Sequence, residues 1–134
     1  MKKFVSRFSV VLLLSVCCVL LVSQCKKDTI CHAKIKAYYS ENGVDILEPA
    51  ANAHVQIGTN TNYADFARAE GYTDADGVFT WDFKYEASLD VVAENSRELW
   101  INENESVQAT YRGSSQIKLV PGETVEVTIL LLPE

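Results

Sequence analysis

Apolar and polar residues alternate with a period of two in the middle of this chain, over residues 78–85. The aromatic residues of this stretch occupy every second position: Phe79, Trp81, Phe83 and Tyr85. Because successive side chains of a β-strand point to opposite faces, all four rings lie on the same face of one strand. The pattern predicts that the first three rings lie in a core and that only Tyr85, at the end of the strand, is a candidate for exposure.

Shorter alternating segments surround this aromatic strand. They predict further strands at 33–39, 54–59, 87–94, 106–111, 116–120 and 124–132. Residues 60–72 have a weaker pattern, which fits an irregular edge strand better than a single helical turn. Seven or eight short strands and no convincing helix favour an all-β fold, a two-sheet β-sandwich.

The connections between these strands contain residues typical of turns. Turns are predicted at 40–43, at 112–115 and at 120–123, where Pro121 and Gly122 suit the second and third positions of a type II turn. A hairpin could join 78–85 to 87–94. Residues 95–105 are polar and acidic around Leu99-Trp100-Ile101, which predicts a long loop with an apolar plug.

The first 24 residues differ from this pattern. A basic start is followed by the apolar run 8–22, and this order indicates a targeting signal that does not belong to the fold. The following Val22-Ser23-Gln24-Cys25 resembles a bacterial lipoprotein signal. The resemblance implies cleavage before Cys25 and a lipid on its thiol, with an outer-membrane location suggested by Lys26. An uncleaved membrane anchor is the alternative, although the run is short for a spanning helix.

This division gives a signal peptide at 1–24, a lipidated Cys and short tether at 25–32, and one β-sandwich domain at 33–134. Cleavage leaves 110 residues with nine basic and 18 acidic side chains, a net charge of −9. An acidic domain repels nucleic acid, so we expect no nucleic-acid partner. Cys31 is then the only thiol of the domain itself, and it is predicted to be a small buried residue. Asp28-Thr29-Ile30 resembles an O-glycosylation acceptor of exported bacterial proteins, but a plain polar tether explains these residues better.

Three further segments resemble a known family. Residues 52–57, the turn Thr73-Asp74-Ala75-Asp76-Gly77 with Val78 and Phe79, and residues 117–124 with the apolar end are similar to the carboxypeptidase regulatory-like domains. These belong to the transthyretin-like (prealbumin-like) β-sandwiches. The resemblance implies a non-catalytic structural, docking or binding module and no shared catalytic residues or cofactor.

Candidate binding chemistry is sparse. Asp74 and Asp76 are spaced like the start of a calcium loop, but the twelfth position is Tyr85 instead of Glu, so a tight turn explains them better. Trp100, Tyr63 and Tyr72 are candidate glycan-binding rings, and their alternative role is to plug the ends of the sandwich.

Tyr111-Arg112-Gly113-Ser114 resembles the tetrapeptide that ends the transthyretin-related hydroxyisourate hydrolases. Here twenty residues follow it, and the two histidines, His32 in the tether and His54 beside a core strand, lack the spacing of a catalytic site. The sequence therefore predicts a non-enzymatic, lipid-anchored envelope module that binds or assembles with an envelope protein or glycan. A glycan- or calcium-binding accessory protein is the alternative, and a hydrolase is a remote one.

Overall fold

The computed structural model describes residues 29–60 and 63–134, which form eight strands and one short 3-10 helix. The strands are β1 (Cys31–Tyr39), β2 (Glu48–Pro49), β3 (His54–Ile57), β4 (Ala69–Tyr72), β5 (Val78–Phe83), β6 (Ser88–Asn102), β7 (Glu105–Lys118) and β8 (Thr124–Pro133), and the helix is η1 (Asp65–Ala67). The all-β class and the number of strands confirm the prediction from the sequence.

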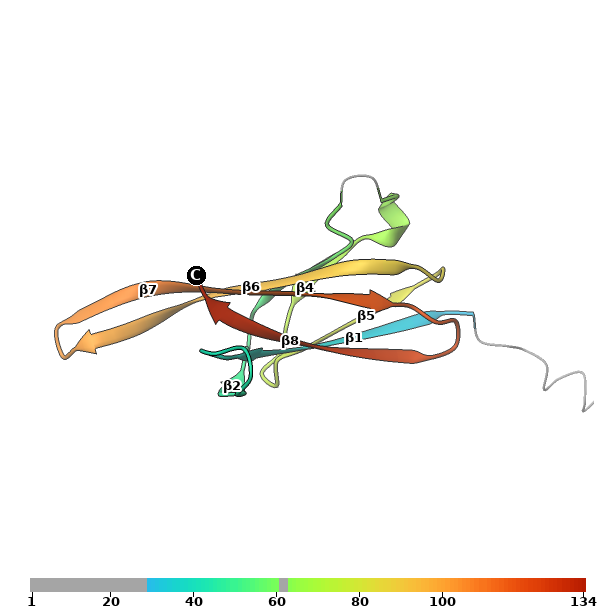
Figure 1. The fold of residues 1–134 in the computed structure, drawn as a ribbon. Coiled ribbons are helices and arrows are strands. Elements are labelled where there is room, and N and C mark those ends of the chain that lie inside the picture. Colours follow the sequence, from blue (N-terminus) through green and yellow to red (C-terminus); the bar gives the residue numbers. More distant parts are fainter. Residues whose placement is uncertain (1–28, 61–62) are drawn as a thin grey trace, which may run out of the picture.

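The strands form one mixed sheet in the order β2-β1-β8-β7-β6-β3-β4, and β5 also pairs with β1. β1 and β8 run parallel, and the other pairs are antiparallel. The sheet curls so that β1, β5 and β8 form one layer and β3, β4, β6 and β7 form the other, which gives a sandwich-like fold (Figure 1).

The core lies between these two layers. Its fully buried larger side chains come from both of them: Ile35, Val55, Ile57, Leu89, Val91, Ile117, Leu119, Ile129 and Leu131. Along β1 and β3 every second residue is buried, as expected for strands with one face on a core. The inward residues of β8 follow the predicted alternation, with Ile129 and Leu131 buried at its end.

The aromatic strand β5 differs from the prediction in two respects. It pairs with β1, with Cys31 opposite Phe83, and not with the strand that follows it, so the predicted hairpin is wrong. Phe79 and Phe83 are buried as expected, but Trp81 exposes 45% of its surface. The ring of Trp81 stacks beside that of Phe79, with centroids 6.3 Å apart and the planes 20° from parallel.

The predicted loop at 95–105 and the predicted turn at 112–115 are also wrong. β6 and β7 occupy both segments except for the tight turn at residues 103–104, and they pair from Ser88 opposite Lys118 to Asn102 opposite Glu105, with an irregularity between Trp100 and Asn102. Their outer part, residues 95–110, extends beyond the rest of the sandwich (Figure 1), and we call it the arm. Both faces of the arm meet solvent, so its polar composition reflects exposure and not a lack of regular structure.

Other boundaries shift by a few residues. β1 begins at Cys31, so His32 belongs to a strand and not to the tether. Residues 60–72 contain both of the structures considered for them, because the helical turn η1 precedes the edge strand β4. The predicted turn at 120–123 is present, with Gly122 at φ +75° and the Glu123 N–H donating to the Val120 carbonyl at 3.2 Å.

The predicted signal segment 1–24 and lipid site Cys25 lie outside the described residues. Cys31 is fully buried, as predicted for a small apolar residue. Between residues 29 and 134, apart from 61 and 62, there is no helix with the length and apolar character needed to cross a membrane.

Candidate functional site

A row of polar and aromatic side chains crosses the outer face of the layer formed by β4, β3, β6 and β7. Strand pairing places Tyr72 opposite His54, His54 opposite Glu94, and Glu94 opposite Arg112. Val55 and Ile57 point to the core, so the alternation along β3 directs His54 outward. The row therefore brings together four residues that are far apart in the sequence.

His54 is the centre of this row. Its Nε2 lies 3.2 Å from Glu70 Oε1, and its Nδ1 lies 3.9 Å from Glu94 Oε1. The imidazole also packs against the Tyr72 ring, with centroids 5.2 Å apart and the planes tilted by 37°. Tyr72 itself remains 63% exposed, so one face of an aromatic ring is available to a ligand beside two carboxylates.

A shallow hollow of about 480 Å³ lies along this row. It is lined by Asn52, His54, Tyr72, Glu94, Asn95, Ser96 and Thr110. The lining thus combines a ring with carboxylate, amide and hydroxyl groups, which can accept and donate hydrogen bonds.

Asn95 fixes the base of the hollow. Its Nδ2 donates to Tyr39 Oη at 2.7 Å and to the Ala51 carbonyl at 3.0 Å, and its Oδ1 accepts from the Ser96 N–H at 2.9 Å. Burial raises the pKa of Tyr39 even though the Asn95 bond acts in the opposite direction. These hydrogen bonds hold the Asn95 side chain in place, so the other residues that line the hollow are the ones available to bind a ligand.

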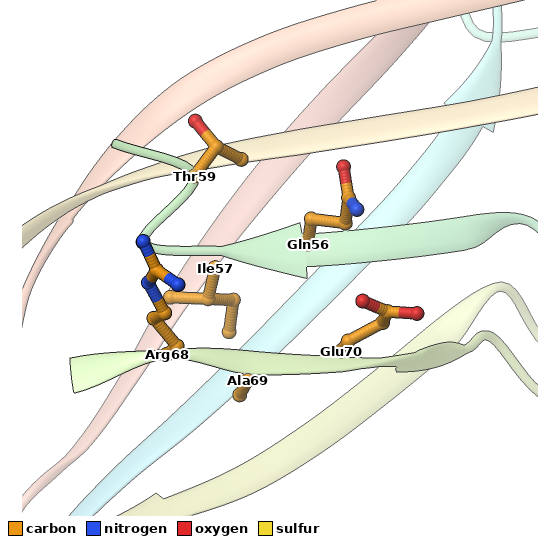
Figure 2. A pocket seen from close by; sticks show the side chains of 7 residues that line it. Gln56, Ile57, Thr59, Arg68, Ala69 and Glu70 are labelled. Carbon is orange, nitrogen blue, oxygen red and sulfur yellow. The ribbon is translucent and has the colours of Figure 1, made fainter. Parts of the chain in front are cut away.

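A second hollow of about 340 Å³ adjoins the first on the same face. Its lining includes Gln56, Thr59, Arg68 and Glu70 (Figure 2). In Figure 2 the polar groups of these four residues point to one side of β3 and β4, away from the Ala69 side chain. Glu70 lines this hollow and pairs with His54 of the other, so the two hollows form one continuous polar surface.

The three rings proposed from the sequence are in different environments. Tyr72 and Trp100 are 63% and 66% exposed, so neither plugs the sandwich. Tyr63 is half-buried against the core, which fits the plug interpretation. Trp100 lies on β6 six residues beyond Glu94, about 20 Å along the strand, so one small ligand cannot contact both Trp100 and Tyr72.

Asp74 and Asp76 form the predicted tight turn. Asp74 Oδ1 accepts from the Asp76 N–H at 2.9 Å and from the Val78 N–H at 3.0 Å, and Gly77 adopts φ +74°. Thr73 Oγ1 ties the turn to the preceding segment by accepting from the Ala53 N–H at 2.8 Å. No group of three or more His, Cys, Asp or Glu side chains within 29–60 and 63–134 is arranged to hold a metal ion.

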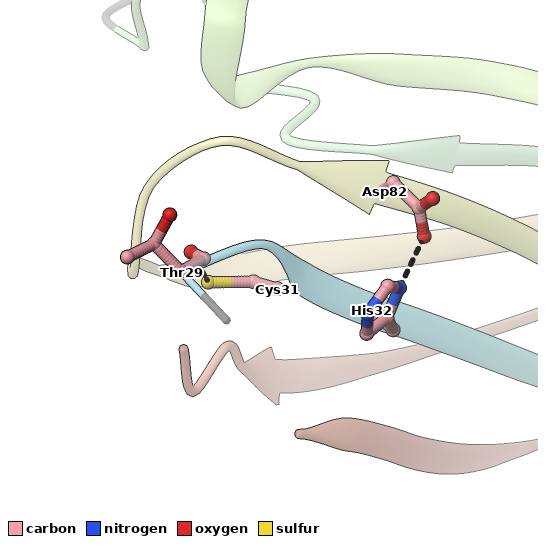
Figure 3. Close-up of polar contacts among 4 residues, drawn as sticks. All are labelled: Thr29, Cys31, His32 and Asp82. Atoms are coloured by element: carbon pink, nitrogen blue, oxygen red, sulfur yellow. Dashed lines mark hydrogen bonds and ion pairs between the residues drawn. The ribbon is translucent and has the colours of Figure 1, made fainter. Parts of the chain in front are cut away.

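The hydrolase-like tetrapeptide lies in the middle of β7. Tyr111 is buried there, and its ring meets Tyr39 edge to face at 5.1 Å. His32, on the other layer, pairs through Nδ1 with Asp82 Oδ1 at 2.6 Å (Figure 3). The two histidines thus lie on different layers, each with its own carboxylate partner.

Sequence reasoning missed Glu70 and Glu94 and treated His54 as a surface or packing residue. The alternation around His54 places it on an outer face, but the register that sets it between Glu70 and Glu94 depends on strands 16 and 40 residues away. Cross-strand register of this kind is not encoded in any local pattern.

Two solved structures resemble this fold. One is a crystal structure of a candidate carbohydrate-binding protein from Pseudomonas aeruginosa, with a TM-score of 0.58 and 8% sequence identity over 78% of this chain and 90% of that one. The other is a 9R-lipoxygenase from Cyanothece, with a TM-score of 0.38 and 15% identity over 76% of this chain and 16% of that one. No protein-family model and no curated protein sequence matches the chain. The first of these similarities shows a shared fold, and the second is too weak to support any argument.

Proposed function

We propose that this protein is a non-catalytic carbohydrate-binding module of the bacterial cell envelope, held at the membrane by a lipid on Cys25. The observation that carries the proposal is the exposed Tyr72 ring beside His54, Glu70 and Glu94, above a hollow with further polar groups. Sugars need both components, because their apolar faces stack on rings and their hydroxyl groups bond to carboxylates and amides.

The preorganisation of the two carboxylates supports this choice. Each lies close to a different nitrogen of His54, so the imidazole limits the positions that they adopt in the free protein. The protein then loses less conformational entropy when a ligand binds. Ser96 and Thr110 add hydroxyl groups on the arm side of the hollow, and Gln56 and Arg68 extend the surface on the other side.

The fold comparison makes sugars the first ligands to screen, but it does not favour them over other ligands. The Pseudomonas protein is described as a candidate carbohydrate-binding protein, and at 8% identity its fold alone is transferable. The choice between sugars and other polar ligands therefore rests on the side chains of this chain.

Two observations support a non-catalytic module over the hydrolase alternative. Tyr111 of the hydrolase-like tetrapeptide is buried against Tyr39, and His54 is on the outer face, opposite to the side on which Tyr111 packs. Incubation with hydroxyisourate tests this part of the proposal, because turnover above the spontaneous rate would refute it.

The binding claim is tested on an array of immobilised oligosaccharides with the intact protein and the Tyr72→Ala variant. Loss of the stacked ring should weaken any glycan bound in this hollow by about tenfold or more in Kd. Tyr85→Ala is the matched control, because Tyr85 is similarly exposed but lies outside both hollows. Absence of glycan binding, or equal losses in both variants, would reject the proposed site.

The anchoring claim needs a separate test. Cells that express the full chain are labelled with a fatty acid, and the protein is then isolated. We expect label on the native chain and none on Cys25→Ala, whereas label that persists in the variant would defeat the claim.

A further inference from the structure

Three exposed apolar residues lie toward the end of the sandwich where the described chain begins, and two of them are in contact. Ile30, Phe66 and Tyr85 expose 44%, 62% and 54% of their surfaces. The rings of Phe66 and Tyr85 meet edge to face with centroids 5.1 Å apart. The contact joins the two exposed rings into a small apolar patch, and apolar patches on a surface can mark sites of contact with a protein or a membrane.

Strand pairing places these residues at the same end. Cys31, next to Ile30, pairs with Phe83, and Tyr85 follows Phe83 by two residues. The Ile30 carbonyl accepts from the Gly122 N–H at 2.9 Å, so the turn between β7 and β8 also lies here. Trp81, two residues before Phe83 on β5, remains 45% exposed and is the next exposed ring along this strand.

The covalent chain limits how far this end can lie from Cys25. Four residues separate Cys25 from Ile30, and the five steps between them span only about 17 Å even when fully extended. The tip of the arm lies at the other end, because Leu89 is paired near the start of β6 and Asn102 lies thirteen residues farther on, about 40 Å away. A lipid on Cys25 therefore holds Ile30, Phe66 and Tyr85 close to the bilayer and keeps Trp100 away from it.

We propose that Ile30, Phe66 and Tyr85, with Trp81 at their side, form a membrane-contact surface that inserts into the interfacial region of a phospholipid bilayer. This inference rests on the lipid anchor of the proposed function and adds the orientation of the domain. Tyr and Trp rings favour the membrane interface because they combine an apolar body with a polar group. With this contact the arm points away from the membrane. The outer face that carries Tyr72 then remains accessible to soluble glycans.

The charges at this end favour contact with zwitterionic lipid. Lys84 and Lys118 are accompanied by Asp65, Glu86 and Glu123, all of them exposed, so these described residues carry no excess of positive charge. Attraction to anionic head groups needs clusters of basic residues, and apolar insertion is therefore the main source of the contact. The long stem of Lys84 can lie along the apolar surface while its ammonium group reaches a phosphate.

The test uses single-tryptophan forms of the full-length, acylated protein in phosphatidylcholine vesicles with brominated acyl chains, which quench nearby tryptophan. The reporter for the contact surface is Trp81→Phe/Trp100→Phe/Tyr85→Trp, and the matched control is Trp81→Phe, which retains Trp100 on the arm. We expect the reporter at position 85 to lose most of its emission relative to unbrominated vesicles and Trp100 to lose little. Equal quenching of both positions, or quenching of neither, would overturn the proposed contact.

Flotation of the same samples separates this inference from the anchor itself. Protein that floats with the vesicles but shows no quenching at position 85 is anchored without the contact, and the inference is then wrong while the anchor stands. Protein that is not acylated and does not float refutes the anchor and removes the basis of the inference as well. Circular dichroism and the melting temperature of each variant, compared with the native chain, confirm that the substitutions leave the fold intact.

Discussion

The guanidinium group of Arg97 lies over the ring of Tyr39, 4.6 Å from its centroid, and joins the base of the arm to β1. The same group makes an ion pair with Glu48 of β2, with Nη1 and Oε1 2.6 Å apart. Tyr111 meets the Tyr39 ring edge to face, and the same guanidinium lies 6.0 Å from the centroid of the Tyr111 ring. At the base of the arm, the end of the sandwich is therefore covered by polar and aromatic side chains and not by aliphatic ones.

Replacement of Arg97 by Ala should destabilise the domain by about 1–2 kcal/mol, the sum of a partly desolvated cation–π contact and a half-exposed ion pair. Urea unfolding measures the loss as a lower midpoint at an unchanged slope. Arg97→Lys keeps the charge but loses the planar stack, so it should recover only part of the stability. Full recovery by Lys would mean that charge alone explains the role of Arg97.

Phe79→Ala and Trp81→Ala should differ in cost although the two rings are neighbours on one strand. Phe79 is 9% exposed, and its loss should cost about 3–5 kcal/mol, whereas Trp81 at 45% exposure should cost less than half as much. Thermal or urea unfolding of both variants provides the comparison. Similar losses would place Trp81 in the core, as the sequence pattern alone predicts.

These two residues show what the sequence could and could not predict. The period of two predicts that these rings lie on the same face of the strand, because the alternation of side chains is a local property of a strand. Whether each position on that face is covered depends on the segments that pack against it from elsewhere in the chain, and here they bury Phe79 and Phe83 but leave Trp81 45% exposed. The same limit applies to His54, because the register between strands determines that Glu70 and Glu94 are its partners. It also applies to the arm: both of its faces are exposed, so its strands have the polar composition of a loop.

The turns at 73–77 and 120–123 were predictable because their requirements are local, whereas the predicted turn at 112–115 lies within β7. Gly77→Ala tests this at φ +74°, where an added Cβ would lie 2.5 Å from the Ala37 carbonyl oxygen. The substitution combines backbone strain with a clash against main chain and should cost about 2 kcal/mol or more. Asp74→Ala, which removes two hydrogen bonds to backbone amides without strain, should cost about 1–2 kcal/mol in the same unfolding assay. A Gly77→Ala variant as stable as the native chain would contradict the assigned turn.

The ion pair between Lys36 and Glu126 should make the stability of the domain fall in acid. Lys36 Nζ lies 2.9 Å from Glu126 Oε1, and this hydrogen bond, together with the charge of Lys36, holds the pKa of Glu126 below its ordinary value. Because the pKa is lower in the folded state, the stabilisation is complete above about pH 4.5, the ordinary value, and disappears as the pH falls through the folded-state pKa.

The comparison of the native chain with Glu126→Gln isolates this contribution. The difference between their melting temperatures should be constant near neutral pH and shrink below about pH 4.5, and 1 M salt should reduce it at every pH because the pair is exposed. Glu86→Gln is the control, because no ion pair holds Glu86 among the residues that the structure describes. A difference for Glu126→Gln that does not change with pH would show that the pair contributes nothing to acid stability.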